Sequence, residues 1–185
     1  GAYLGRTYSI WLSLLGTPEQ VHARIYGQNY HLVVMPSKEP KLAEIRHQYL
    51  HFLLDPLAVK YGLEINQKSE LKLLIRSAPL LGSDFKEDFP LFVTECLIRA
   101  AELRMDKRPP AEAEKSLADL TASGFVLGSY FYRALANYEK QEASFRLVYS
   151  GLIDGIDLAK EKEQLATVRF ASSPPPTSSQ PVPPV

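Results

Sequence analysis

The chain has 185 residues and 45% hydrophobic content, which suits one ordinary globular domain with a packed core. Its 21 Lys and Arg balance its 21 Asp and Glu without any block of like charge, so we expect no nucleic-acid partner. No apolar run reaches the roughly 18 to 20 residues that span a bilayer. The single Cys96 excludes an internal disulfide framework and a cysteine-rich zinc ribbon.

Residues 1–36 are typical of β-strands. The segments YSIWLSLLG, QVHARIYG and NYHLVVMP are rich in β-branched and aromatic residues and are separated by turn-forming residues. The residues GQN between the last two segments predict a hairpin. We therefore expect N-terminal antiparallel strands.

From Pro40 onward the pattern changes to that of helices. Residues 40–55 open with a proline and carry an apolar stripe at helical spacing, and Asp55-Pro56 is expected to stop or kink this helix. In residues 88–105, Asp88 is expected to cap the helix and Pro90 to lie in its first turn. Helical periodicity also covers residues 69–81, 111–124, 127–141 and 142–166.

Strands followed by helices predict an α+β fold, with an antiparallel sheet packed on a helical bundle. Pairs of helices in the second half also leave a helical-repeat architecture open. We expect one domain over residues 1–170 and a flexible linker or tail over 171–185, where ASSPPPTSSQPVPPV holds no charged or aromatic residue. We expect such a segment to lead to a further part of a longer protein. The compartment stays open, with an extracytoplasmic or periplasmic one favoured.

The segment HQYLH places His47 and His51 four residues apart on the first helix. Residues at this spacing project from one face, so the two imidazoles could bind one metal ion together. The same spacing is compatible with two hydrogen-bonded histidines that have only a structural role. The pair therefore needs a third ligand before it defines a metal site.

Glu95 is the best candidate for that ligand. It lies in LFVTECLIRAA, an apolar helical segment where an unpaired carboxylate would be costly to bury. Arg99 follows one turn later and offers a competing explanation as an ordinary ion-pair partner. It could equally hold a carboxylate that binds metal.

HQYLHFLLDP followed by ECLIRA resembles the gluzincin class of zinc metallopeptidases. The similarity is closest to bacterial gluzincin-like domains that read His-Glu-aromatic-x-His, then Asn-Pro or Asp-Pro, then Glu-x-x-x-Arg-Ala. It implies a zincin-like fold in which His47, His51 and Glu95 bind zinc and Asp55 and Arg99 support them. It also implies a peptide or protein substrate, whose backbone would add to an edge strand formed by NYHLVVMP.

Gln48 stands where these peptidases have the glutamate that acts as general base. An amide cannot accept the proton of the attacking water, and loss of such a group costs typically about 10² to 10⁴ in rate. Three accounts stay open: a pseudo-peptidase that binds zinc or peptide, a natural glutamate that has been replaced, or another base. Glu44, one turn before His47, is the local alternative base.

The sequence thus predicts a zinc-binding, metallopeptidase-like domain that is catalytically impaired. The alternative is a non-enzymatic helical interaction module with structural histidines. Tyr130, Tyr132 and Tyr138 could stabilise an oxyanion but are more typical of a core stripe. Cys96 is interpreted as a buried small hydrophobe. The two remaining histidines, His22 and His31, lie in expected strands and have no evident partners.

Overall fold

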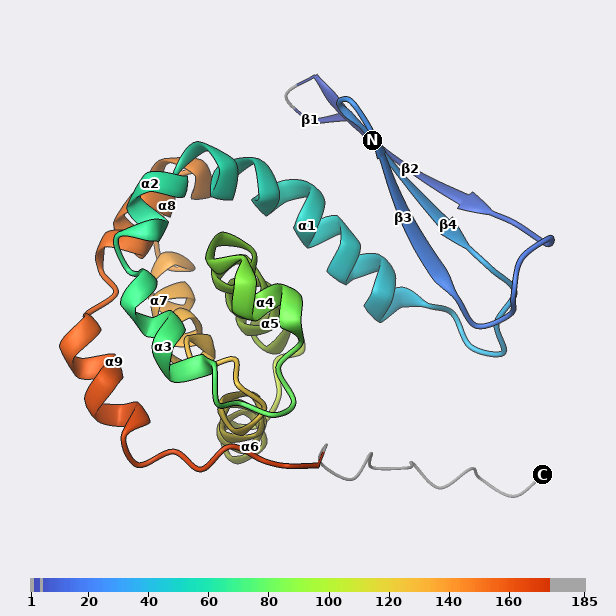
Figure 1. Cartoon of the computed structure of the whole chain (residues 1–185). Helices are drawn as coiled ribbons and strands as arrows, with labels where there is room; N and C mark the ends of the chain where they lie inside the picture. The colour runs from blue at the N-terminus through green and yellow to red at the C-terminus, as the bar shows by residue number, and fades with distance from the viewer. Residues whose placement is uncertain (1, 4, 174–185) are drawn as a thin grey trace. The chain divides into compact units, whose positions relative to one another are not determined.

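The computed structural model describes residues 2–3 and 5–173 and confirms a mixed α+β architecture (Figure 1). The chain divides into two compact units, Gly1–Gly62 and Leu63–Val185, and each is described by itself. The first unit holds the strands and the longest helix, and the second holds helices. Residues 174–185, which make up most of the expected flexible tail, lie outside the described residues.

The first unit is built on a sheet whose strands follow the order β1-β2-β4-β3. Its strands are β1 (Ala2–Tyr3), β2 (Arg6–Leu12), β3 (Val21–Tyr26) and β4 (Asn29–Val34). The expected hairpin is confirmed, because β3 and β4 pair in antiparallel fashion around Gly27-Gln28. Gly27 has a φ of 59°, the left-handed conformation that a two-residue hairpin loop needs and that glycine adopts without strain.

The expectation of a purely antiparallel sheet is wrong, because β2 and β4 pair in parallel, with Tyr8 beside Tyr30 and Leu12 beside Val34. After the connection over residues 13–20, β3 forms the far edge of the sheet and is not a neighbour of β2. β4 then lies between β2 and β3. Tyr30, Leu32 and Val34 are buried, so the strand with the most apolar inner face takes the central position.

The central position of β4 also corrects the expectation that NYHLVVMP forms a substrate-binding edge strand. β4 is hydrogen-bonded to β2 on one side and to β3 on the other, so it has no open edge to which a peptide could add. Within the described part of the chain, β3 is paired with β4 alone. A peptide added to this sheet would have to use the outer edge of β3 or the part of β2 beyond its short pairing with β1.

Helix α1 (Leu42–Lys60) packs on one face of the sheet. Phe52 enters a buried cluster with Tyr8, Tyr30, Leu32 and Val34. The Tyr8 hydroxyl also donates to the backbone oxygen of Ile45, 3.2 Å away. Side chains of alternating strand residues and one stripe of the helix thereby form the core of the first unit.

Asp55-Pro56 was expected to stop or kink this helix. The stop is wrong, because α1 continues through Pro56 to Lys60. Proline has no backbone N–H, so the helix leaves the carbonyl of Phe52, four residues earlier, without its helical donor. Arg6 of β2 donates a guanidinium hydrogen to this carbonyl, and its guanidinium carbon lies 4.6 Å from the centre of the Phe52 ring. The strand thus supplies the hydrogen bond that the proline removes.

The second unit is helical. Its elements are α2 (Gly62–Asn66), the 3₁₀ turn η1 (Ser69–Leu71), α3 (Lys72–Ile75), α4 (Ser83–Glu87), α5 (Phe89–Met105), α6 (Pro110–Ala122), α7 (Gly128–Tyr138), α8 (Phe145–Asp154) and α9 (Leu158–Leu165). The expected helix over residues 69–81 is wrong as one element, since α3 ends at Ile75, ahead of Pro79. The expected segment 142–166 is two helices, because Asp157 caps a new one by accepting from the N–H groups of Ala159 and Lys160.

Helix α5 lies among the other helices of this unit and packs against α4, α6 and α7 (Figure 1). Its predicted start is confirmed: the Asp88 carboxylate accepts from the N–H of Leu91 at 3.0 Å, and Pro90 lies in the first turn. Ten of its residues are buried, from Phe89 to Leu103. In the described part of the chain, no helix is both long and apolar enough to cross a membrane.

Gly124 lies in the loop after α6, in a backbone conformation that favours glycine, and we expect Gly124→Ala to destabilise the protein. Its φ is 105°, and an added Cβ would lie 2.9 Å from the Cβ of Ala78 and 3.0 Å from that of Leu81. Strain and overpacking together should lower the free energy of unfolding by about 2 kcal/mol or more. Urea denaturation measures this change.

Gly151→Ala is the matched control for that experiment. Gly151 lies inside α8, and an added Cβ would meet no atom within 4 Å. Replacement by alanine should leave stability unchanged or raise it by up to about 1 kcal/mol, because glycine is a poor helix former. Equal midpoints for the wild-type chain and Gly124→Ala would show that the loop relaxes freely.

Candidate metal centre

Helix α1 carries both histidines of the HQYLH segment on one face. The rings of His47 and His51 lie with their centroids 5.0 Å apart and their planes at 72°. Both side chains are half-buried, so each is partly accessible to solvent. The spacing of four residues therefore brings two imidazoles together as the sequence predicts.

Asp55 orients the second histidine. Nδ1 of His51 lies 3.0 Å from Oδ1 of Asp55, one turn further along α1. A carboxylate only accepts hydrogen bonds, so Nδ1 carries the hydrogen, and in the neutral ring the lone pair is then on Nε2. A carboxylate that accepts from one ring nitrogen while the other binds metal is common around zinc.

Tyr30 of β4 holds the side chain at the position of the missing base. Its hydroxyl donates to Oε1 of Gln48 at 2.6 Å. The pKa of Tyr30 is raised to about 12, chiefly by burial and further by the nearby charge of Asp55. Tyr30 is therefore protonated at neutral pH and acts as a stable donor.

The partnership of Tyr30 with Gln48 was not predicted from the sequence. The sequence pattern that bears on this pairing is the alternation in NYHLVV. It places the side chains of residues 30, 32 and 34 on the face of the sheet that α1 covers. That period places Tyr30 against the helix but does not say which of its residues it meets. The pairing depends on how β4 and α1 pack, and that is set by the whole core of the first unit.

Glu95 is the buried carboxylate of α5. Only 2% of its surface is exposed, and its Oε1 lies 2.7 Å from Nε of Arg99, four residues later on the same helix. The guanidinium carbon of Arg99 also lies 4.2 Å from the centre of the Phe125 ring. Both expected roles of Arg99 thus share one geometry, in which it neutralises Glu95 and restricts its orientation.

His47, His51 and Glu95 form a group that could hold a metal ion, because each offers one ligand atom and these atoms all lie within 4.8 Å of one another. Two imidazole nitrogens and one carboxylate oxygen are a donor set that zinc favours. Ligand atoms around a tetrahedral zinc ion lie about 3 to 3.5 Å apart, since each bond is about 2.0 to 2.2 Å. The donor set therefore fits a zinc ion by its chemistry.

The alternative base lies apart from this group. Glu44 is half-exposed and pairs with Lys41 at 3.6 Å, and it is not among the three residues whose ligand atoms cluster. Cys96, next to Glu95, is fully buried, and burial raises the pKa of its thiol. It is therefore a small core residue, as expected, and not an activated nucleophile.

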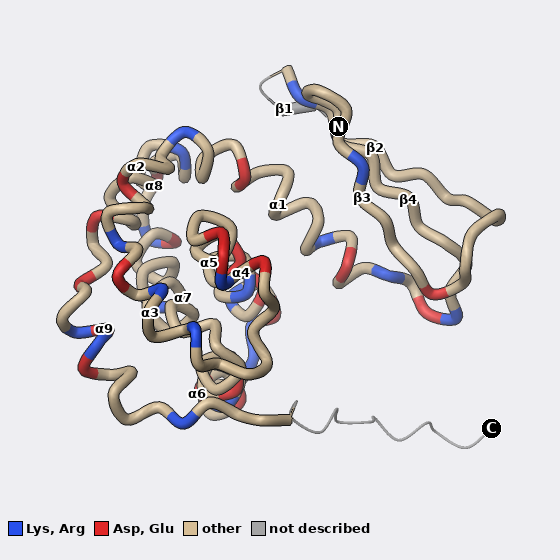
Figure 2. Tube along the Cα trace, in the orientation of Figure 1, with Lys and Arg blue, Asp and Glu red and all other residues tan. Residues whose placement is uncertain are grey.

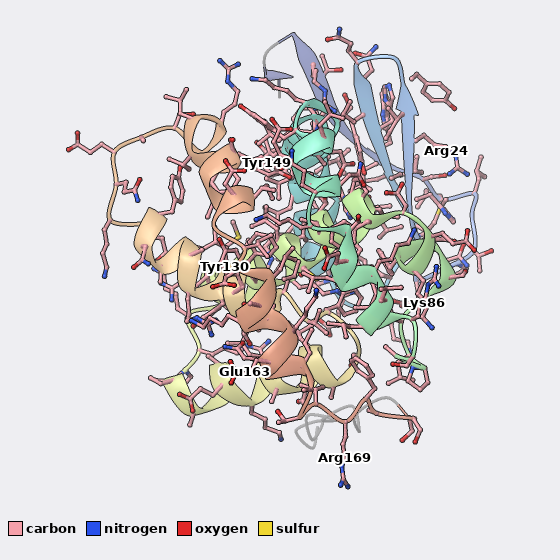
Figure 3. All side chains as sticks on the ribbon, turned by 60° about the vertical axis from the view of Figure 1, so that its left-hand side comes forward. Arg24, Lys86, Tyr130, Tyr149, Glu163 and Arg169 are labelled. Atoms are coloured by element: carbon pink, nitrogen blue, oxygen red, sulfur yellow. The ribbon has the colours of Figure 1, made fainter. Side chains whose placement is uncertain are left out.

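The tyrosines of α7 have structural contacts in the second unit. The hydroxyl of Tyr130, labelled in Figure 3, donates to the carbonyl of Leu152 at 2.7 Å. The ring of Tyr132 faces the guanidinium of Arg104 at 4.9 Å. The three tyrosines are half-buried, whereas the buried residues of α7 are Gly128, Phe131 and Leu135, so the tyrosines border the core and do not form it. The ring of Tyr138 likewise packs edge-on against that of Phe145, with centroids 5.0 Å apart.

The remaining histidines have partners, contrary to expectation. Nε2 of His22 donates to Oε1 of Gln20 at 2.9 Å, and Nδ1 of His31 accepts from Nε1 of Trp11 at 2.9 Å. His22 lies in β3 and His31 in β4, as the strand pattern predicts. Neither belongs to the group of possible metal ligands.

No protein-family model, curated protein or solved structure matches this chain. The function must therefore be argued from the chemistry of the site.

Proposed function

We propose that this protein is a zinc-binding, metallopeptidase-like domain of the gluzincin type that binds peptides and hydrolyses them poorly or not at all. The observation that carries the proposal is the group of His47, His51 and Glu95, whose ligand atoms lie within 4.8 Å of one another. Their chemistry is that of a zinc site with three protein ligands. The zincin-like fold is part of the same proposal.

In this proposal, zinc would be held by the two imidazoles and the Glu95 carboxylate and would supply a Lewis acid for a peptide carbonyl. Asp55 supports it because a hydrogen bond at Nδ1 of His51 fixes the ring and makes the other nitrogen a better ligand. Arg99 supports it because the ion pair at 2.7 Å restricts Glu95. These partners are what a site that binds zinc tightly requires.

Gln48 gives the site its proposed lack of activity. Its Oε1 accepts from Tyr30, while its amide NH₂ donates to no partner in the described part of the chain. An amide in this state can donate to the oxygen of a bound peptide but cannot take up a proton. The residue therefore favours holding a ligand over hydrolysing it.

The second candidate function is a non-enzymatic interaction module with structural histidines. It is favoured by the two ion pairs, His51 with Asp55 and Glu95 with Arg99, because each pair partly satisfies its members without metal. Metal content separates the two candidates.

We expect the purified chain to bind about one zinc ion, as three protein ligands form one site. Elemental analysis after zinc-supplemented purification and desalting measures this. His47→Ala/His51→Ala should remove the zinc, and His22→Ala/His31→Ala, which changes the two histidines of β3 and β4, should retain it. Metal-free wild-type chain, or unchanged zinc in the first double variant, would exclude the site.

A further inference from the structure

The second unit has a pocket that is open to solvent. Its volume is about 600 Å³, within the range of pockets that take small molecules. One wall consists of residues of α2, η1 and α3 and the residue that follows α3, and the other wall lies where α4 passes into α5. All of the lining residues belong to the second unit. None of them is one of the three possible metal ligands, so the pocket uses other side chains.

The first wall presents two cations and a hydroxyl group. Ser69 opens η1, Lys72 opens α3, and Arg76 follows α3 directly. Leu71, Lys72 and Arg76 all have right-handed helical backbone dihedrals, so η1 and α3 run on as one helical stretch. Residues three and four apart share one face of a helix, and this spacing brings Ser69, Lys72 and Arg76 to the pocket together.

The opposite wall presents two carboxylates. Glu87 is the last residue of α4, and Asp88 is the extended residue that caps α5, so the two acids are consecutive. The Asp88 carboxylate accepts from the N–H of Leu91 at 3.0 Å and is thereby held in place. In the described part of the chain, the Glu87 carboxylate has no hydrogen-bond or ion-pair partner. Figure 2 colours the basic positions of the first wall blue and these acidic positions red.

Lys72 joins the two walls and leaves Arg76 unpaired. Nζ of Lys72 donates to the backbone oxygen of Glu87 at 2.5 Å, which fixes α3 against the segment between α4 and α5. Arg76 is exposed, and its guanidinium has no hydrogen bond, ion pair or ring contact among the described residues. A cation and an anion, Arg76 and Glu87, therefore line one pocket without neutralising each other. A ligand that carries one charge of each sign would satisfy both.

The pocket also has an apolar part. Phe89 and Pro90 line it next to the two acids, and Leu73, which is 66% exposed, lines it next to Lys72. Contact between Leu73 and an apolar group of a ligand would remove apolar surface from water and so favour binding. The matching ligand therefore carries an apolar group in addition to its two charges.

We propose that this pocket binds a di- or tripeptide with free termini and an apolar side chain. The peptide carboxylate would pair with Arg76, whose planar guanidinium holds a carboxylate through two parallel hydrogen bonds, and would accept from the Ser69 hydroxyl. The peptide ammonium group would donate to the Glu87 carboxylate.

The dimensions of the pocket set the length of this ligand. The cube root of its volume is roughly 8 Å, and two to three extended residues span about 7 to 11 Å. A longer extended peptide would carry its two terminal charges out of the pocket. The proposal therefore concerns short peptides.

Isothermal titration calorimetry of the purified chain with the tripeptide Gly-Leu-Gly tests the proposal. We expect saturable binding. N-acetylation removes the ammonium charge and C-amidation removes the carboxylate charge, so each should weaken binding about tenfold or more, the cost of losing one charge-assisted contact. Leucine alone and inorganic phosphate should each bind at least about tenfold more weakly than the tripeptide. Binding should persist in His47→Ala/His51→Ala, which lacks two of the proposed zinc ligands, so the outcome is independent of the proposed function.

Two variants assign the charges to their partners. Arg76→Gln and Glu87→Gln should each weaken binding of Gly-Leu-Gly about tenfold. Arg76→Gln should not weaken binding of the C-amide further, and Glu87→Gln should not weaken binding of the N-acetyl peptide further, because the interacting charge is already absent. A merely structural role would not produce this pairing. Arg146→Gln is the matched control, since Arg146 is exposed on α8 and does not line the pocket.

Several results would overturn the proposal. These are the absence of any heat of binding at millimolar tripeptide, equal affinities for the free and the blocked peptides, and equal effects of Arg76→Gln and Arg146→Gln. Phosphate or leucine that binds as tightly as the tripeptide would replace the proposal with a simple anion site or an amino-acid site. Loss of binding in a folded His47→Ala/His51→Ala variant would assign the tripeptide to the metal site instead.

Discussion

Gln48→Glu should raise the turnover of a cleavable peptide by about 10² or more, within the range typical of a general base. The chain with Gln48 in place should show little or no peptidase activity. The physical reason is that a carboxylate at residue 48 can take the proton from water and deliver it to the leaving amine. Tyr30 would hold this carboxylate as it now holds the amide oxygen. A mixed peptide library, assayed at matched zinc occupancy, is the measurement.

Two controls isolate the effect. Gln67→Glu adds the same charge at an exposed position of the second unit and should leave activity at the background level. Gln48→Glu combined with His51→Ala should lose the gained activity, because the proposed zinc ligand is then missing.

Other outcomes would change the assignment. If the chain as written cleaves efficiently and Glu44→Gln abolishes the cleavage, Glu44 is the base despite its exposure and its pairing with Lys41. If the chain as written and its Gln48→Glu variant both bind zinc and neither cleaves any peptide, the proposal of a restorable base fails. A role in peptide binding alone would then be the better explanation.

Asp55→Ala should weaken zinc binding by about 10- to 100-fold, the usual cost of removing a carboxylate that orients a liganding histidine. Without Asp55, the His51 ring loses its fixed tautomer and is free to rotate. Competition with a chromophoric chelator measures the affinity, and circular dichroism checks that the helix is retained. Asp55→Asn, which still accepts a hydrogen bond, should recover part of the loss.

Glu44→Ala is the matched control for Asp55→Ala. It removes a carboxylate from the same helix, but one that pairs with Lys41. It should change the zinc affinity by less than about threefold, because its charge is exposed to solvent screening and is paired with Lys41. Equal losses in the two variants would indicate a general electrostatic effect and remove the support that Asp55 gives to the site.

The sequence predicted those elements whose signals are local. The start of α5 is set by the Asp88 cap and by Pro90 within four residues, and both signals act without help from the rest of the chain. The hairpin of β3 and β4 turns at Gly27-Gln28, where a glycine between two strand-forming segments is likewise a local signal. The two histidines share a helix face because of spacing alone, so their proximity was also predictable.

Features that depend on distant partners were not predictable. The pairing of β2 with β4 follows from which strand fills the centre of the sheet, and residues 13–20 do not determine that choice. The continuation of α1 through Pro56 depends on Arg6, far away in sequence. The donor to Gln48 depends on Tyr30 for the same reason. In each case the feature depends on a contact between a strand and a second element that is distant in the sequence.

The bond from Arg6 to the Phe52 carbonyl has a consequence for how the first unit opens. Pro56 leaves the Phe52 carbonyl of α1, next to His51, without its helical hydrogen bond, and Arg6 of β2 supplies a hydrogen bond instead. Fraying of β2 would therefore loosen α1 next to His51, although the two are far apart in sequence. Amide hydrogens of β2 and of the middle of α1 should then exchange together, as one cooperative unit. In the proposed metal site, metal affinity would then be linked to the integrity of a strand that supplies no ligand.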